Sequence, residues 1–177
     1  NHNCSYCAYR SDNLQLGQSM LKSDSIPENK MYEIVDDLDQ MGVKAVTFSG
    51  GGEPLIYPHI VETIESLLSG DIQVATLTNG SRLTDAVGQV LARGATWVRI
   101  SMDAANEETY AKNRRVSNNE FPRILKNIEA FAQAKHAGCE LGINYIVTKE
   151  NYSDTYSFIK HMKDLGANHV KISECVV

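Results

Sequence analysis

The chain of 177 residues is 42% hydrophobic and 22% charged, and it carries a net charge of −5. That length suits a single domain with its own core; no cluster of Lys and Arg indicates a nucleic-acid partner, and no apolar run approaches the roughly 18 residues of a membrane-spanning helix. The four cysteines are too few for a disulfide scaffold, so we expect a reducing, cytoplasmic setting in which a close cysteine pair serves metal or redox chemistry.

Residues 1–26 are polar and irregular, and they contain one Cys-x-x-C pair, Cys4 and Cys7. Such a pair fits half of a zinc site, a thioredoxin-like redox pair or part of an iron–sulfur site. Structural zinc needs four ligands, but Cys139 and Cys175 are isolated in the sequence. A thioredoxin-like pair should begin a helix, whereas about twenty residues separate Cys7 from the first predicted helix. The zinc site and the thioredoxin-like pair are therefore less favoured than the iron–sulfur site, although neither is excluded.

One unit recurs from residue 27 onward: an amphipathic helix, a glycine and a short apolar strand. The first helix is expected to begin with a capping box formed by Ser25 and Glu28, with Pro27 in its first turn. The expected helices have apolar faces within residues 31–41, 60–68, 83–91, 121–131 and 158–165, and the expected strands are 45–48, 72–77, 97–100, 141–147 and 169–172.

This alternation of helix and strand predicts an α/β fold, because parallel strands need long crossover connections and helices usually supply them. Right-handed crossovers that all wind one way curl such a sheet into a full or partial barrel. In folds of this kind the functional residues lie at the carboxyl ends of the strands. We therefore expect the candidate site residues to follow the predicted strands.

The first predicted strand is followed by a run of glycines, in the segment Phe48-Ser49-Gly50-Gly51-Gly52-Glu53-Pro54. Three consecutive glycines remove every side chain from this strand end, so that a bulky ligand can approach the backbone closely. Glu53 adds a carboxylate, and Pro54 stiffens the turn that presents it. Carbonyl oxygens and a carboxylate together suit a cationic amine.

A cysteine loop followed about forty residues later by a strand ending in Gly-Gly-Glu-Pro resembles the radical S-adenosylmethionine (SAM) family. The family's motif is Cys-x-x-x-Cys-x-aromatic-Cys, and Cys4, Tyr6 and Cys7 match its second cysteine, aromatic residue and third cysteine. The first cysteine is expected immediately before Asn1, and the family's first barrel strand is also expected before it. The resemblance implies a partial (β/α)6 TIM-like barrel with parallel strands, in which residues 1–177 form the core domain of a longer protein.

In this family, three cysteines bind a [4Fe-4S] cluster whose fourth iron is chelated by the amino and carboxylate groups of SAM. Reductive cleavage of SAM gives a 5'-deoxyadenosyl radical, which abstracts hydrogen from the substrate. The resemblance thus implies an enzyme with a [4Fe-4S] cluster and SAM as cofactors, and with a reducing electron donor such as flavodoxin or ferredoxin. It leaves the substrate open between a small molecule and a peptide, although family detail also resembles the subgroup that modifies peptides and proteins, often with auxiliary clusters beyond the barrel.

The resemblance also implies roles for residues at the strand ends. Cys4 and Cys7 would bind the cluster, and the segment of Gly51, Gly52 and Glu53 would accept hydrogen bonds from the SAM amino group. Further SAM-binding roles fall on Thr78, Asn79, Ser101, Asp103 and Arg114, with Tyr6 beside adenine and Asn144 and Val147 on the adenine or substrate side. Arg114 would pair with the SAM carboxylate, because a guanidinium can grip a carboxylate with two hydrogen bonds, and Arg115 is its competitor.

Ordinary structural roles remain open for several of these residues. Ser101 and Asp103 also suit the cap of a following helix. Asn79 with Gly80 suits a plain turn, and Arg114 suits a solvated surface.

Two other functions also remain open. One is a non-catalytic zinc- or nucleotide-binding α/β module, which would be colourless and carry zinc. The other is a thiol–disulfide oxidoreductase that uses Cys4 and Cys7 and oxidises reversibly without metal. Neither explains the glycine run before Glu53. Cys139 is expected to serve packing. Cys175 follows the last predicted strand at the mouth end, and we favour a structural role for it over that of a ligand or a hydrogen-atom donor.

Overall fold

The computed structural model describes residues 1–9, 17–21 and 24–175. Within them, five parallel strands form one sheet in the order β1-β2-β3-β4-β5. The strands are β1 (Ala45–Phe48), β2 (Gln73–Thr78), β3 (Ala95–Ser101), β4 (Glu140–Val147) and β5 (His169–Glu174). The helices are α1 (Glu28–Gln40), α2 (Ile60–Ser69), α3 (Asp85–Gly94), α4 (Glu107–Arg114), α5 (Glu120–Ala134) and α6 (Thr155–Asp164), with short 3-10 turns η1 (Pro54–Ile56) and η2 (Tyr152–Asp154). None of the described helices is both long and apolar enough to cross a membrane.

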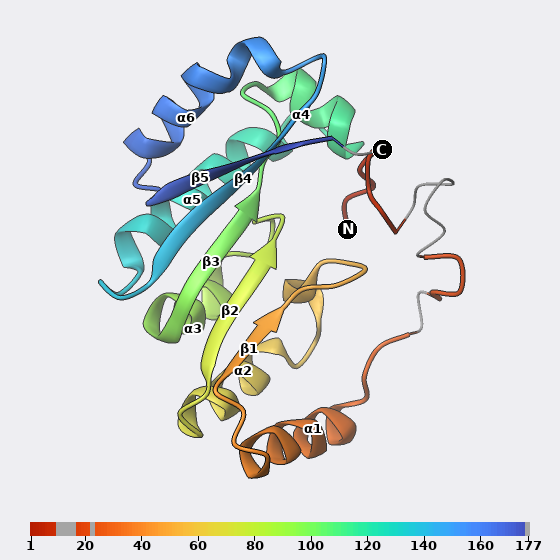
Figure 1. The fold of residues 1–177 in the computed structure, drawn as a ribbon, viewed down its shortest axis with the longest axis vertical. Coiled ribbons are helices and arrows are strands. Elements are labelled where there is room, and N and C mark those ends of the chain that lie inside the picture. The colour runs from red at the N-terminus through yellow and green to blue at the C-terminus, as the bar shows by residue number, and fades with distance from the viewer. Residues whose placement is uncertain (10–16, 22–23, 176–177) are drawn as a thin grey trace.

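Each strand pairs with the one that precedes it in the sequence, and at least one helix makes every crossover. Figure 1 shows the helices along one side of a twisted sheet, with all strand arrows pointing toward the side where residues 1–9 lie. The predicted α/β fold with a partial TIM-like barrel is therefore confirmed. Its consequence for function is that all five strands end at one shared mouth.

All five predicted strands are present, and so are the five helices predicted from apolar faces. Helix α4 lies outside the recurring unit: its buried residues are Tyr110, Ala111, Asn113 and Arg114, two of them polar, so apolar periodicity does not reveal it. The predicted capping box was wrong. Helix α1 begins at Glu28 after an extended Pro27, and no described side chain caps its first turn.

The core lies between the sheet and its helices. Ile64 and Leu91 from the helices, and Ile100 and Ile143 from the strands, are fully buried. Burial of each side chain of this size stabilises the fold by roughly 1.5–3 kcal/mol relative to exposure. Cys139 is only 1% exposed and joins the same core, as its predicted packing role requires.

Candidate functional site

A cavity of about 320 Å³ lies at the carboxyl ends of the strands, and we call it the strand-end cavity. Its lining is Asn1, His2, Cys4, Cys7, Tyr9, Ser49, Gly50, Gly51, Gly52, Glu53, Leu77, Thr78, Asn79, Ser101, Arg114 and Asn144. These residues come from the N-terminal segment, the ends of β1 to β4 and the end of α4. The structure thus brings the predicted site residues to one cavity, with the exception of Tyr6, Asp103 and Val147.

The glycine run after β1 forms one wall of the strand-end cavity. Gly50 has a φ of +140°, a backbone conformation that other residues rarely adopt. A Cβ on Gly51 would lie 2.2 Å from Cε of Met20, whereas a Cβ on Gly52 would meet no described atom within 4 Å. The expected bare strand end is therefore present: Gly50 supplies the backbone turn, and the lack of a side chain on Gly51 allows Met20 to approach its backbone closely.

Glu53 joins the ends of β1 and β2. Its side chain is buried, and Oε1 accepts hydrogen bonds from the Thr78 hydroxyl at 2.5 Å and from the Leu55 backbone N–H at 3.2 Å. Oε2 accepts a hydrogen bond from the Asn79 backbone N–H at 2.7 Å. Since a carboxylate offers about four acceptor positions, about one remains for a ligand in the cavity.

Asp103 follows β3 and lies behind the cavity wall, where it joins four segments of the chain. It is 1% exposed, and its Oδ2 accepts hydrogen bonds from the Tyr6 hydroxyl at 2.8 Å and from the Arg114 guanidinium. Its Oδ1 accepts a hydrogen bond from the Ile146 N–H of β4 at 2.8 Å. Asn151 completes the junction, because its Nδ2 donates to the carbonyls of Asp103 and Ile146 at 3.0 and 2.8 Å. The hydrogen bonds that the Asp103 carboxylate accepts therefore come from other residues of the chain.

Arg114, the last residue of α4, is 5% exposed, which excludes a solvated surface charge. Besides Asp103, it donates a hydrogen bond to Sγ of Cys4 at 3.4 Å, and its guanidinium lies 5.9 and 5.7 Å from the ring centres of Tyr6 and Tyr110. Burial on its own lowers the pKa of Arg114, but the Asp103 carboxylate and its other neighbours outweigh burial and raise that pKa. Arg114 is therefore a fixed positive charge.

Three buried polar atoms of residues that line the cavity have no hydrogen-bond partner among the described residues: Nδ1 of His2, Nε of Arg114 and Oδ1 of Asn144. A buried polar group left without a partner costs about 1–3 kcal/mol. A ligand that carries both a carboxylate and an ammonium group would satisfy the Arg114 donor and the Asn144 acceptor together. The amino-acid part of SAM fits this requirement.

Cys4 and Cys7 are half-buried, and both line the strand-end cavity. The Cys7 N–H donates to the Cys4 carbonyl at 3.3 Å, so a tight turn brings the two residues together. Within residues 1–9, 17–21 and 24–175, no three His, Cys, Asp or Glu side chains gather as a metal site. Two thiols beside a buried guanidinium fit part of the ligand set of an iron–sulfur cluster. The further cysteine expected before Asn1 stays a prediction.

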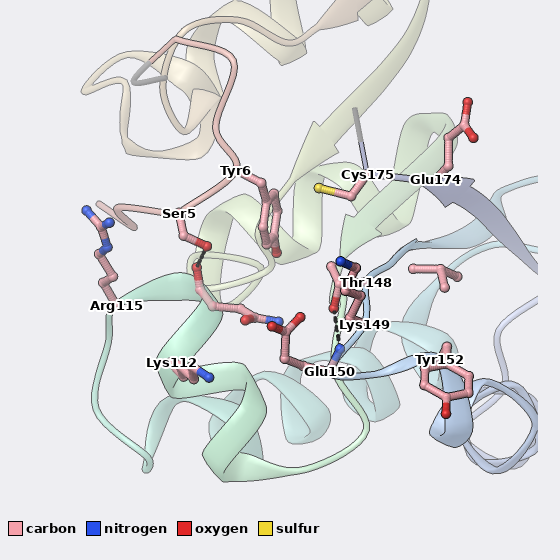
Figure 2. Close-up of a pocket in the computed structure, with 12 residues that line it drawn as sticks. Ser5, Tyr6, Lys112, Arg115, Thr148, Lys149, Glu150, Tyr152, Glu174 and Cys175 are labelled. Carbon is pink, nitrogen blue, oxygen red and sulfur yellow. Dashed lines mark hydrogen bonds between the residues drawn. The ribbon is translucent and has the colours of Figure 1, made fainter. Parts of the chain in front are cut away.

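A larger cavity of about 920 Å³, which we call the outer cavity, begins beside Tyr6. Figure 2 shows Tyr6 and Cys175 on one side of it and Thr148 and Glu150 opposite. The lining is Ser5, Tyr6, Lys112, Asn113, Arg115, Val147, Thr148, Lys149, Glu150, Tyr152, Glu174 and Cys175. Two predicted site residues, Tyr6 and Val147, therefore belong to this cavity, as does Arg115, the predicted competitor of Arg114.

Sequence reasoning missed three residues of the N-terminal segment that line the strand-end cavity: Asn1, His2 and Tyr9. The Asn1 side chain accepts a hydrogen bond from Asn79 Nδ2 at 2.6 Å. Nε2 of His2 lies 3.4 Å from the Glu120 carboxylate, and burial, followed by the charge of Arg114, lowers the pKa of His2 to about 4. The one signal in the sequence that could have found them is that all three lie within three residues of Cys4 or Cys7.

Comparison with known proteins gives consistent matches. The sequence model of the radical SAM superfamily matches residues 1–162. An S-adenosylmethionine-dependent nucleotide dehydratase from Lacinutrix mariniflava is 28% identical over 165 residues, which cover 92% of this chain and 34% of that protein. An AdoMet-dependent heme synthase from Methanosarcina barkeri is 29% identical over 168 residues, or 94% and 45% of the two chains. The crystal structure of Streptococcus suis SuiB bound to S-adenosylmethionine has a TM-score of 0.77 at 16% identity, covering 100% of this chain and 38% of SuiB.

The chain spans about a third to just under half of the length of these two curated relatives. The comparisons support neither a zinc- or nucleotide-binding module nor a thiol–disulfide oxidoreductase. Members of the matched family are enzymes that bind a [4Fe-4S] cluster and SAM, and the thiols, glycine backbone and unpartnered polar atoms described above suit both cofactors. Because the family model matches most of its length, the chain belongs to the radical SAM superfamily.

Proposed function

We propose that residues 1–177 form the cofactor-binding core of a radical SAM enzyme that abstracts hydrogen from a small-molecule or peptide substrate. The observation that carries this proposal is that Cys4 and Cys7 line the same strand-end cavity as the bare backbone of Gly51 and Gly52. When bound, the [4Fe-4S] cluster and SAM supply the electron and the hydrogen-abstracting radical. The chain's own residues bind, orient and shield them.

The glycine wall suits the amino group of SAM. The carbonyls of Gly51 and Gly52 accept hydrogen bonds from it, and the remaining acceptor position of Glu53 adds a negative charge. Oδ1 of Asn144 provides a further acceptor from the end of β4. Thr78 and the Asn79 backbone act through Glu53, because their hydrogen bonds fix the orientation of its carboxylate.

Arg114 and Ser101, which both line the cavity, suit the SAM carboxylate. Nε of Arg114 is a donor without a partner among the described residues, and Ser101 also lines the cavity. Tyr6 and Val147 line the outer cavity, and we assign them to the adenine or substrate side. Asp103 contributes by holding Tyr6 and Arg114.

The outer cavity is our candidate for the approach of the substrate. Lys112, Arg115 and Lys149 give it cationic groups, while Glu150 and Glu174 give it anionic ones. The names of relatives mention a nucleotide in one case and a precursor peptide in another. We therefore keep both substrate classes, a small molecule and a peptide.

Other expectations from the sequence stay proposals. They are a cytoplasmic location, which suits an oxygen-sensitive cluster, and an electron donor of the flavodoxin or ferredoxin type. Membership of the peptide-modifying subgroup, with auxiliary clusters after residue 177, belongs with them, as does a core domain that begins before Asn1.

The test is anaerobic reconstitution of the full-length protein with iron and sulfide, followed by chemical reduction, addition of SAM and an assay for 5'-deoxyadenosine. We expect product from the wild type and its loss in Cys4→Ala and Cys7→Ala. Cys139→Ala is the matched control, because Cys139 is 1% exposed and outside the cavity lining, so product should persist. A colourless wild-type protein that carries zinc and forms no product would overturn the proposal.

A further inference from the structure

Residues 1–7 lie along the C-terminal end of α4 and are bonded to it through the main chain. The Asn3 N–H donates to the Arg114 carbonyl at 3.1 Å, and the Ser5 N–H donates to the Asn113 carbonyl at 3.0 Å. The Ser5 hydroxyl also reaches the Asn113 carbonyl, at 3.5 Å, in one of the hydrogen bonds drawn in Figure 2. The last carbonyls of a helix have no partner within the helix. Here two of them hold the cysteine segment.

The ion pair of Asp103 and Arg114 connects this helix end to the cysteine motif through side chains. The two side chains are 2% and 6% exposed, so the pair is almost completely shielded from water. Asp103 accepts the hydrogen bond of the Tyr6 hydroxyl, while Arg114 donates one to Sγ of Cys4. Two of the residues that match the family's motif are therefore each one hydrogen bond away from the pair.

The backbone on either side of α4 is strained in a way that serves these contacts. Asp103 and Arg115 have φ values of 58° and 52°, in the left-handed region that costs a non-glycine residue of order 1–2 kcal/mol. At Asp103, this conformation accompanies a carboxylate that binds Tyr6 and Arg114 at once. At Arg115, it ends the helix, so that the carbonyl of Arg114 is available to Asn3.

We propose that Asp103 is a positioning residue: acting through Tyr6 and Arg114, it holds residues 1–7 against α4 in the metal-free protein. Cys4 is then preset at the mouth before a cluster is bound. This role differs from the direct SAM contact that the sequence resemblance implies for Asp103. The proposal rests on the proposed function only where Cys4 is taken as a cluster ligand, because the docking of residues 1–7 requires no metal.

The first experiment is hydrogen exchange of the metal-free, reduced full-length protein, with the amides of Asn3 and Ser5 as reporters. In wild type, both amides should be protected by their bonds to α4. In Asp103→Asn, the guanidinium of Arg114 loses its charged partner, and we expect both amides to exchange roughly tenfold faster or more. Amides of β2 in the same sample should exchange at the wild-type rate.

Asp71→Asn is the matched control for this variant. Asp71 also has a left-handed φ, of 59°, but it is exposed and lies before β2, at the end of the sheet opposite to the mouth. The same chemical change there should leave the Asn3 and Ser5 amides unaffected. Exchange at the wild-type rate in Asp103→Asn, with β2 intact, would overturn the proposal.

A second variant covers the case in which Asp103→Asn loosens the whole protein and speeds exchange in β2. Tyr6→Phe removes one hydrogen bond to Asp103 and keeps the ring beside Arg114. We then expect faster exchange at Asn3 and Ser5 in Tyr6→Phe, with β2 unchanged. Unchanged exchange at the two reporter amides would reject the positioning role.

The reconstituted protein gives a readout that loss of folding alone does not shift. Hydrogen bonds and charges near the sulfur ligands set the reduction potential of an iron–sulfur cluster. Asp103→Asn leaves the positive charge of Arg114 uncompensated beside Cys4, so the cluster potential should become more positive, whereas Asp71→Asn should leave it unchanged. An unchanged potential in Asp103→Asn would contradict the link from Asp103 to Cys4. If wild type forms no 5'-deoxyadenosine, the proposed function fails, and the exchange result still decides the docking.

Discussion

Glu53, in the loop that follows β1, accepts a hydrogen bond from Thr78 at the mouth end of β2, with 2.5 Å between Oε1 and the hydroxyl oxygen. One side chain therefore fastens two strands and also faces the cavity. Substitution of Glu53 alone would mix a structural effect with a binding effect, so a comparison of two variants is needed to separate them.

We expect Glu53→Gln and Thr78→Val each to lower the free energy of unfolding by about 1–2 kcal/mol, because each disturbs the same buried hydrogen bond. Only Glu53→Gln should also weaken SAM binding strongly, since it removes the negative charge next to the proposed amine position. Urea unfolding gives the first quantity, and titration of the reconstituted protein with SAM gives the second. Equal losses of SAM affinity in the two variants would show that Glu53 acts only as a strand fastener.

Gly80→Ala should be more destabilising than Gly42→Ala, although both glycines have positive φ values, of 78° and 70°. Each substitution strains the backbone by about 1 kcal/mol. At Gly80, the new Cβ would also lie 3.0 Å from Ile100 and 3.1 Å from Ile124, whereas at Gly42 it would meet no described atom within 4 Å. Overpacking adds about 1–3 kcal/mol at Gly80, which the difference in urea midpoint would reveal. Equal midpoints would contradict this prediction.

Two buried tyrosines should respond in opposite ways to removal of the hydroxyl group. The Tyr110 hydroxyl has no partner among the described residues, so Tyr110→Phe should leave stability unchanged or raise it by up to about 1 kcal/mol. The Tyr145 hydroxyl donates to the Asn151 carbonyl at 2.9 Å, so Tyr145→Phe should cost about 1 kcal/mol. Chemical unfolding of both variants under one set of conditions is the measurement. A larger loss in Tyr110→Phe than in Tyr145→Phe would be inconsistent with this hydrogen-bond assignment.

Stability should fall with rising pH through the titration of Tyr145. Burial raises the pKa of Tyr145 from 10 to about 12. The unfolded chain therefore releases this proton first, so the contribution of Tyr145 to stability is complete below pH 10 and is lost as the pH rises toward 12. Unfolding free energies measured from pH 9 to pH 12 should decline more steeply in wild type than in Tyr145→Phe. Parallel curves would mean that the hydroxyl titrates normally in the folded state.

The sequence predicted the parts of the fold that depend on apolar periodicity. The five strands and the helices beside them follow from spaced apolar residues, such as Ile60, Ile64 and Leu67 in α2, which are buried on one face. Helix α4 was not predicted from apolar periodicity, because polar residues, among them Arg114, occupy its buried side. The capping box of Ser25 and Glu28 failed, because the chain stays extended at Pro27 and the helix begins only after it.

The site was predictable to the extent that its residues follow strands. Glu53 and Thr78 were expected at neighbouring strand ends, and they meet there. The contact of Ser5 with α4 could not be foreseen, because it uses a main-chain carbonyl that every helix end possesses. The pairing of Asp103 with Arg114 accompanies a left-handed φ at Asp103, and local sequence does not specify that conformation at an aspartate.

Asn151 preorganises the part of the mouth formed by the ends of β3 and β4. Completely buried, it joins the turn after β3 to the end of β4, and its Oδ1 accepts the Thr148 N–H at 2.7 Å. A ligand that touches this part of the mouth meets groups whose freedom was already lost when the chain folded. Its affinity there is consequently governed by the fit of its own atoms, since little entropy remains to be removed from the protein on association.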